Sequence, residues 1–143
     1  MKPSLITLLI DDDRDDQEIF SLVMREIYDK AECVFATDGI YALEKIKSNT
    51  SFIPDLIFID INMPRMNGIQ CLAEIKKIKR LQNVPAYMYS TSAEISIVEE
   101  CKKLGATDFI KKHIDTKDLK QDLVRIVSSC LKMDKNANLR KNT

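Results

Sequence analysis

"DLIFIDINMPRMNG" (residues 55–68) joins an apolar run to a single acid and then to a turn. Residues 56–59 are apolar without interruption, which is typical of a strand buried on both faces of a parallel sheet. Asp60 ends this run, and Pro64 and Gly68 favour a turn soon after it. The stretch therefore predicts a central strand that carries a carboxylate to the edge of a sheet.

Short apolar runs alternate with amphipathic segments along the rest of the chain. The expected strands are residues 5–10, 32–37, 55–60, 85–90 and 107–112. The expected helices are residues 15–30, 39–48, 68–81, 93–105 and 115–131. Gly105 suits the end of the fourth helix, and Asp115 or Thr116 can cap the fifth. Strict alternation predicts an α/β fold, a parallel sheet with helices on both faces.

Composition limits the class of protein. The chain has 143 residues, of which 45% are hydrophobic and 31% charged, a balance typical of one soluble domain. Lys plus Arg equals Asp plus Glu at 22 each, so overall charge gives no reason to expect nucleic acid or an anionic membrane as partner. We find no signal peptide and no membrane-spanning run, and we expect a cytoplasmic protein. The four cysteines form no CxxC motif, which favours reduced thiols.

Four expected strands end in charged or reactive side chains, and the carboxyl ends of parallel strands share one edge, where open α/β sheets bind ligands. These side chains are Asp11-Asp12, Asp60, Ser90-Thr91 and Lys111-Lys112. Carboxylates held close together repel one another and need a cation, and hard oxygen ligands with open positions suit Mg²⁺. One carboxylate could accept a phosphoryl group as nucleophile. The cation and a lysine would stabilise the transferring charge, and a serine could hydrogen-bond it.

The motifs "LLIDDD" (8–13), "PDLIFIDINMPRMNG" (54–68), "VPAYMYSTS" (84–92) and "GATDFIKK" (105–112) occur together in this order. In these motifs and their spacing the chain strongly resembles the receiver domain of bacterial two-component response regulators, of the single-domain CheY-like kind. The resemblance covers residues 4–131 and implies a doubly wound, flavodoxin-like five-stranded parallel sheet in the order 2-1-3-4-5. The polar residues 132–143 are expected to form a disordered tail.

The resemblance assigns roles at the predicted metal site. Asp60 matches the phosphoacceptor. Asp12 matches a direct Mg²⁺ ligand, and Asp11 matches an acid that binds the ion mostly through water. Asn62 matches the position whose backbone carbonyl completes the metal shell. Mg²⁺ is thus the one cofactor that the resemblance implies.

The resemblance also assigns a phosphoryl contact and a conformational switch. Lys112, rather than Lys111, matches the lysine that contacts the phosphoryl group. Ser90 matches the hydroxyl residue that turns toward this group, and Phe109 matches the aromatic residue that swings inward when it does. The family usually has proline after the lysine, joined by a cis bond, whereas this chain has His113. A cis bond without proline costs about 3–4 kcal/mol, so the isomer of the Lys112–His113 bond stays open.

By the same resemblance, the chain is a stand-alone receiver in phosphorelay signalling and not an enzyme, although it assists its own phosphotransfer and autodephosphorylation. The expected phosphoryl donor is a sensor histidine kinase or a histidine phosphotransfer protein. The expected output is contact with a downstream protein, onward relay of the phosphate, or a homodimer through the fourth helix, fifth strand and fifth helix. No DNA-binding domain and no membrane partner are expected.

Two other functions have less support in the sequence. A phosphohydrolase of the haloacid dehalogenase type needs DxDx[TV] after the first strand, but Asp15 occupies the Thr/Val position. A receiver-fold scaffold that is never phosphorylated is supported only by the absent proline. The other acids of the first loop are expected to serve the start of a helix, whose positive dipole end favours them, rather than to bind metal: Asp13, Asp15 and Asp16.

Overall fold

The computed structural model describes residues 4–91, 94–112 and 115–141. Their five parallel strands form one sheet in the order β2-β1-β3-β4-β5, as the resemblance implied. The strands are β1 (Leu5–Ile10), β2 (Ala31–Ala36), β3 (Leu56–Asp60), β4 (Ala86–Ser90) and β5 (Asp108–Lys111). Every residue of β3 and β4 is buried, whereas the edge strands β2 and β5 are only partly covered. Uninterrupted apolar runs therefore lie at the centre of the sheet, where both faces need them.

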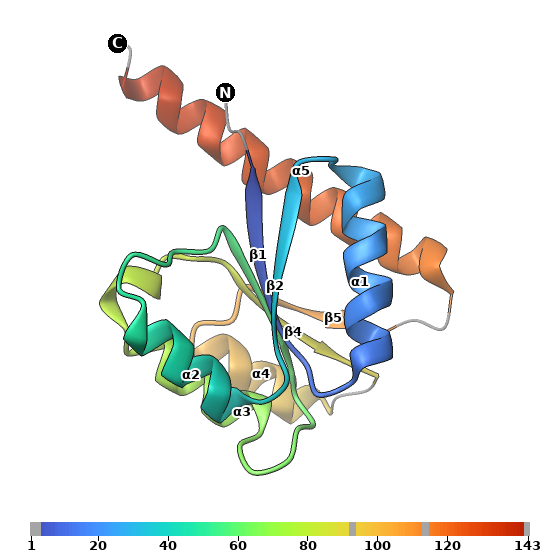
Figure 1. Ribbon diagram of the computed structural model, residues 1–143, viewed down its shortest axis with the longest axis vertical. Helices are drawn as coiled ribbons and strands as arrows, with labels where there is room; N and C mark the ends of the chain where they lie inside the picture. The colour runs from blue at the N-terminus through green and yellow to red at the C-terminus, as the bar shows by residue number, and fades with distance from the viewer. Residues whose placement is uncertain (1–3, 92–93, 113–114, 142–143) are drawn as a thin grey trace.

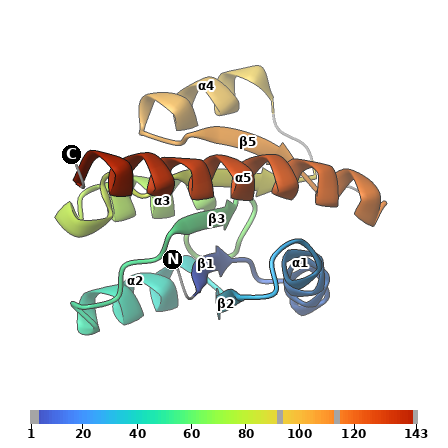
Figure 2. The same cartoon turned by 90° about the horizontal axis from the view of Figure 1, so that it is seen from above.

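Helices cover both faces of the sheet (Figures 1 and 2). α1 (Arg14–Ile27) and α5 (Thr116–Lys141) lie on one face. α2 (Gly39–Ser48), α3 (Gly68–Lys76) and α4 (Ile95–Lys103) lie on the other. No helix of the described segments is long and apolar enough to cross a membrane.

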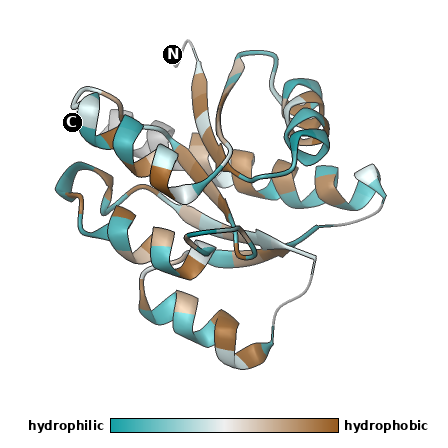
Figure 3. Ribbon diagram, turned by 60° about the horizontal axis from the view of Figure 1, so that its bottom comes forward, coloured by the Kyte–Doolittle hydropathy of each residue, from teal (hydrophilic) through white to brown (hydrophobic). Residues whose placement is uncertain are grey.

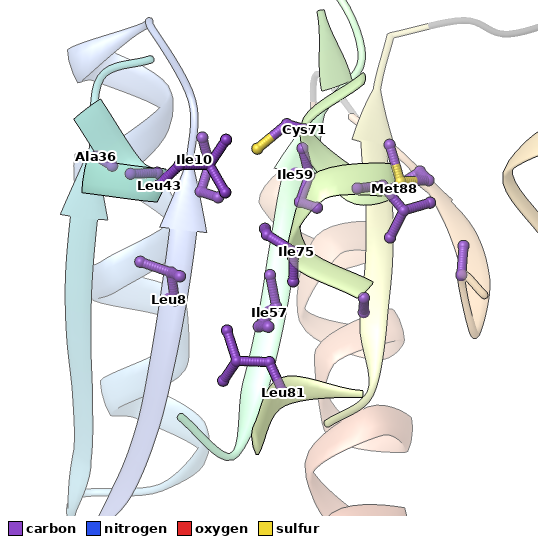
Figure 4. Packing of buried hydrophobic residues seen from close by; sticks show 14 of the residues in the cluster. Leu8, Ile10, Ala36, Leu43, Ile57, Ile59, Cys71, Ile75, Leu81 and Met88 are labelled. Atoms are coloured by element: carbon purple, nitrogen blue, oxygen red, sulfur yellow. The ribbon is translucent and has the colours of Figure 1, made fainter. Parts of the chain in front are cut away.

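Two hydrophobic clusters, one on each face, hold the layers together. Leu8, Ile57 and Ile75 belong to the cluster between the sheet and α2, α3 and α4 (Figure 4). Phe20 and Phe58, whose ring centroids are 4.9 Å apart, belong to the cluster beneath α1 and α5. Apolar residues accordingly concentrate on the strands and on the sheet-facing sides of the helices (Figure 3). Burying each such side chain contributes about 1.5–3 kcal/mol.

Local capping follows the sequence at several helix ends. Asp13 caps α1 by accepting hydrogen bonds from the backbone N–H groups of Asp15 and Asp16. Asp115 accepts the N–H of Lys117 at the start of α5, so the aspartate is the capping residue of the two candidates. Gly105, with φ of 110°, ends α4 in the left-handed conformation that glycine tolerates. The capping expectations from sequence are confirmed at these three positions.

The apolar spacing of residues 68–81 predicted one helix, but the structure divides this segment into two elements. α3 ends at Lys76, and a short 3₁₀ turn, η1 (Lys79–Leu81), follows it. The break brings Arg80 to the carboxyl end of α2, where its guanidinium donates to the carbonyls of Ile46, Asn49 and Phe52. Helix ends leave such carbonyls without intrahelical partners, so Arg80 satisfies groups that a continued α3 would not reach.

The chain beyond Leu131 also differs from expectation. α5 continues to Lys141 rather than ending at 131, so most of the segment predicted to be a disordered tail is helical (Figure 1). The sequence contains neither proline nor glycine after residue 115, so nothing in the backbone forces the helix to stop. The polarity of this segment indicated that it lacks a core-facing pattern, but polarity alone does not determine where a helix ends.

Candidate functional site

Asp60 is held at the carboxyl end of β3 by the turn that follows it. Its side chain is only 7% exposed, and its Oδ1 accepts the backbone N–H of Asn62 at 3.1 Å. Gly68 returns the chain against the strand, donating its N–H to the Ile61 carbonyl at 2.8 Å. A Cβ at Gly68 would lie 2.2 Å from the Asp60 carbonyl oxygen, so only glycine allows this approach. The quoted stretch thus fixes the carboxylate by a close backbone contact as well as by burial.

The acid pair follows β1, and the strand register brings it beside Asp60 because Ile10 pairs with Ile59. Asp11 is fully buried, whereas Asp12 is exposed. Asp11 Oδ1 accepts the Asp13 N–H at 3.0 Å. One carboxylate oxygen from each of Asp11, Asp12 and Asp60 lies within 4.8 Å of the others.

Lys112, the residue after β5, completes the cluster. Its backbone N–H donates to the Ser90 carbonyl at 2.7 Å, which fastens the end of β5 to β4. Its side chain turns inward, and Nζ lies 2.8 Å from Asp11 Oδ2 and 3.2 Å from Asp60 Oδ2. A third carboxylate, that of Asp16 in the first turn of α1, lies 2.9 Å from the same nitrogen. One partly buried ammonium therefore lies between three acids.

Burial and these contacts shift the ionisation of the cluster. Burial raises the pKa of Asp11 to about 6, although Lys112 and the Asp13 N–H act against the shift. Burial likewise raises the pKa of Asp60 above its ordinary value, with Lys112 opposing. Burial would lower the pKa of Lys112, but its contacts with Asp11 and Asp16 raise it well above the usual range. The Lys112 ammonium therefore stays charged at neutral pH. Its attraction does not fully offset the effect of burial on the pKa values of Asp11 and Asp60, which remain raised.

These residues fit a divalent cation. Asp11 Oδ2 is fully buried and receives no hydrogen bond of good geometry, even though Lys112 Nζ is close. A buried carboxylate oxygen without such a bond is costly unless a charge satisfies it. Three carboxylates within reach of one point are hard oxygen ligands of the kind that Mg²⁺ and similar ions prefer. The acidic cluster therefore suits a divalent metal.

Ser90 and Asn62 form the wall of the site on the β4 side. Ser90 is buried at the end of β4, and its Oγ lies 3.3 Å from the Asn62 side-chain amide, which donates to it. Asn62 therefore contacts both Asp60, through its N–H, and Ser90, through its side chain. Phe109 is partly buried and packs against the cluster under α2, α3 and α4. The structure brings Ser90 into the site and places Phe109 on the adjoining strand.

Sequence reasoning missed two contributors to the site. The position of Asp16 in sequence predicts only an interaction with the helix dipole, yet its side chain binds Lys112. Gln17 donates its side-chain amide to the Asp11 carbonyl at 2.7 Å, which fastens α1 to the site. The only sequence signal for either residue was its place in the first turn of the helix after the acid pair. His113 lies outside the described residues, so the question of a cis or trans Lys112–His113 bond also lies outside them.

Comparisons with known proteins agree with this arrangement. A family model described as the response regulator receiver domain matches residues 7–124. The chemotaxis protein CheY of Thermotoga maritima is 33% identical over 98 residues, which cover 68% of this chain and 80% of CheY. A rice protein (Oryza sativa subsp. indica), the two-component response regulator-like PRR73, is 29% identical over 117 residues, or 82% of this chain. The chain spans only 15% of the length of PRR73.

Two solved structures are similar over most of the fold. The phosphorylated cyanobacterial phytochrome response regulator RcpA superposes with a TM-score of 0.80 at 25% identity, covering 90% of this chain and 94% of RcpA. A complex of CheX with CheY, BeF₃ and Mg²⁺ from Borrelia burgdorferi matches with a TM-score of 0.73 at 27% identity. This match covers 86% of the present chain and 89% of the other.

Proposed function

This chain belongs to the response regulator receiver domain family of two-component signalling, and from that premise we propose that Asp60 accepts a phosphoryl group from a phosphohistidine of a partner protein. The observation that carries the proposal is the convergence of four chemically matched groups at one sheet edge. Two buried acids, an exposed acid and a partly buried lysine come from three different strand ends. Membership of this family also leaves the dehalogenase-type phosphohydrolase without support.

In the proposed reaction a carboxylate oxygen of Asp60 attacks the phosphorus of the phosphohistidine. A P–O bond forms, the P–N bond breaks, and its electron pair leaves with the donor imidazole. Lys112 supplies a fixed positive charge to the phosphoryl oxygens, since its ammonium already lies 3.2 Å from the accepting carboxylate. A preorganised charge of this kind needs no rearrangement during transfer, which lowers the barrier.

Asp11, Asp12 and Asp60 would hold the divalent cation, for which Mg²⁺ is our proposal, together with the backbone carbonyl of Asn62. When bound, the ion would neutralise charge on the phosphoryl oxygens and on the crowded carboxylates. The raised pKa values of Asp11 and Asp60 describe the chain without metal. A cation beside these acids favours their ionised forms, so metal binding would keep Asp60 nucleophilic at neutral pH.

We propose that Ser90 couples phosphorylation of Asp60 to a conformational change at the surface. Its hydroxyl oxygen accepts a hydrogen bond from the side-chain amide of Asn62, and the hydroxyl can also donate one. A charged phosphoryl oxygen on Asp60 would be a strong acceptor, so the hydroxyl would turn toward it. The buried space vacated by Ser90 would admit Phe109, altering the surface formed by α4, β5 and α5. A downstream protein or a second copy of the chain would read that surface, or the phosphate would be relayed onward.

A small acyl-phosphate donor tests the proposal without a known kinase. Intact mass is measured after incubation with acetyl phosphate, with Mg²⁺ or with EDTA. We expect one added phosphoryl group in Mg²⁺, little in EDTA, and none in Asp60→Asn. Equal labelling of Asp60→Asn would contradict the site assignment. Absence of label in every sample would favour the never-phosphorylated scaffold.

A further inference from the structure

Lys112 has one carboxylate partner that stands apart from the acids able to hold a metal. Its ammonium lies 2.8 Å from Asp11, 3.2 Å from Asp60 and 2.9 Å from Asp16. The first two carboxylates belong to the group that can enclose one cation, whereas Asp16 does not. The ammonium donates hydrogen bonds to Asp16 and Asp60 and forms an ion pair with Asp11.

A divalent cation in the acidic cluster would weaken two of these three contacts. Asp11 and Asp60 would then share their charge with the metal, and the metal would repel the neighbouring ammonium. Asp16, outside the cluster, keeps its full attraction for Lys112. Phosphoryl transfer needs Lys112 near Asp60. With metal bound for that transfer, Asp11 and Asp60 attract Lys112 least.

Asp16 is itself held by a chain of hydrogen bonds that returns to the site. Asp13 donates its N–H to Asp11 Oδ1 at 3.0 Å, and Asp16 donates its N–H to Asp13 Oδ1 at 3.2 Å. The Asp16 carboxylate then accepts from Lys112 Nζ, which contacts Asp11 again. The contacts form a closed ring across β1, α1 and the end of β5. A group fixed on the first turn of a helix is better placed than one on a free loop to orient a flexible lysine.

We propose that Asp16 is a positioning residue that retains Lys112 beside Asp60 when the acidic cluster binds metal. The inference rests on the proposed phosphoryl transfer and deepens it by naming how the lysine stays in place. Asp16 touches neither Asp60 nor the cluster oxygens in the contacts described above; it acts through Lys112.

The rate of phosphorylation by acetyl phosphate in Mg²⁺ gives the first test. Loss of one charge-assisted hydrogen bond corresponds to roughly a tenfold change in rate, so Asp16→Asn should be slowed about tenfold. Asp16→Glu, which keeps the charge, should recover part of the rate. Asp15→Asn is the matched control, since it removes the same charge from an exposed neighbour, and its rate should equal that of the unaltered chain.

A double-mutant cycle separates positioning from a general structural role. In a Lys112→Ala background, Asp16→Asn should cause no further slowing, because there is no ammonium left to hold. Mg²⁺ affinity should be unchanged by Asp16→Asn within about threefold, since a carboxylate outside the cluster acts on the metal only at a distance. Equal slowing in both backgrounds, or a wild-type rate in Asp16→Asn, would overturn the proposal.

Reactivity of Lys112 toward an acylating reagent gives a readout that needs no phosphorylation. Modification is mapped by peptide mass, with the exposed Lys111 as internal reference. Asp16→Asn should raise the Lys112-to-Lys111 ratio several-fold in Mg²⁺, and Asp15→Asn should not. An unchanged ratio would overturn the role of Asp16. If the unaltered chain takes no phosphoryl group, the proposed function fails, and this ratio still decides whether Asp16 holds the lysine.

Discussion

Replacement of Asp11 by asparagine should stabilise the chain in the absence of metal. Asp11 is fully buried, and burial raises its pKa from 3.8 to about 6. About two pKa units at about 1.36 kcal/mol each correspond to roughly 3 kcal/mol of folding free energy lost when the acid ionises. Asparagine has nearly the same shape without the charge. Since Lys112 also loses one partner, we expect a net gain of about 1–3 kcal/mol near pH 7.

The pH dependence of this gain has a definite sign. The pKa of Asp11 is higher in the folded chain than in the unfolded chain, so the folded chain binds the proton more tightly. The contribution of the acid to stability is complete below pH 4 and is lost as the pH rises through about 6. The difference in unfolding free energy between Asp11→Asn and the unaltered chain should therefore vanish below pH 4 and be fully developed at pH 7.

Urea denaturation at several pH values, in EDTA and in millimolar MgCl₂, measures these differences. Mg²⁺ should stabilise the unaltered chain and leave Asp11→Asn almost unaffected, because a ligand stabilises only the state that binds it. Asp13→Asn is the control, since asparagine caps a helix as well as aspartate does, and its stability should stay within about 0.5 kcal/mol. A destabilised Asp11→Asn at pH 7, or a gain in stability that persists below pH 4, would show that burial of the ionised Asp11 does not destabilise the fold.

Three further changes test other parts of the account. Gly68→Ala should lower the unfolding free energy by about 2–3 kcal/mol, because the added Cβ would meet fixed backbone atoms. Gly39→Ala is the control and should cost less, because its Cβ would meet a flexible methionine sulfur at 3.0 Å. Equal urea midpoints for the two variants would contradict this. Arg80→Ala should cost about 1–3 kcal/mol and speed hydrogen exchange at the end of α2, whereas exposed Lys79→Ala should do neither. Ser90→Ala should still accept phosphate on Asp60 but lose the shift of the Phe109 ring resonances seen by NMR; an unchanged shift would remove Ser90 from the switch.

The sheet was predictable because its sequence signal is local. Short uninterrupted apolar runs are typical of buried strands, and they predicted β3 and β4 within one residue. The strand order came from the resemblance, since periodicity alone does not order parallel strands. The convergence of Asp11, Asp60 and Lys112 followed from geometry, because parallel strands place their carboxyl ends at one edge.

The remaining features depend on contacts between distant residues. Asp13, Asp15 and Asp16 look alike in sequence, yet only helical phase decides that the first caps α1 and the last meets Lys112. The break after Lys76 places Arg80 at the end of α2, and the apolar spacing of residues 68–81 carries no information about that contact. The continuation of α5 reflects the absence of a stop signal rather than a pattern, and polarity was the wrong guide to it.

Mapping the phosphorylated residue shows whether Asp60 is the phosphoacceptor. The chain is treated with acetyl phosphate and Mg²⁺ and then reduced with borohydride, which converts an aspartyl phosphate to homoserine. Peptide mass spectrometry locates the product. The account predicts homoserine at position 60 alone, dependent on Mg²⁺. Homoserine at another acid of the cluster, or phosphate on a residue other than an aspartate, would contradict it.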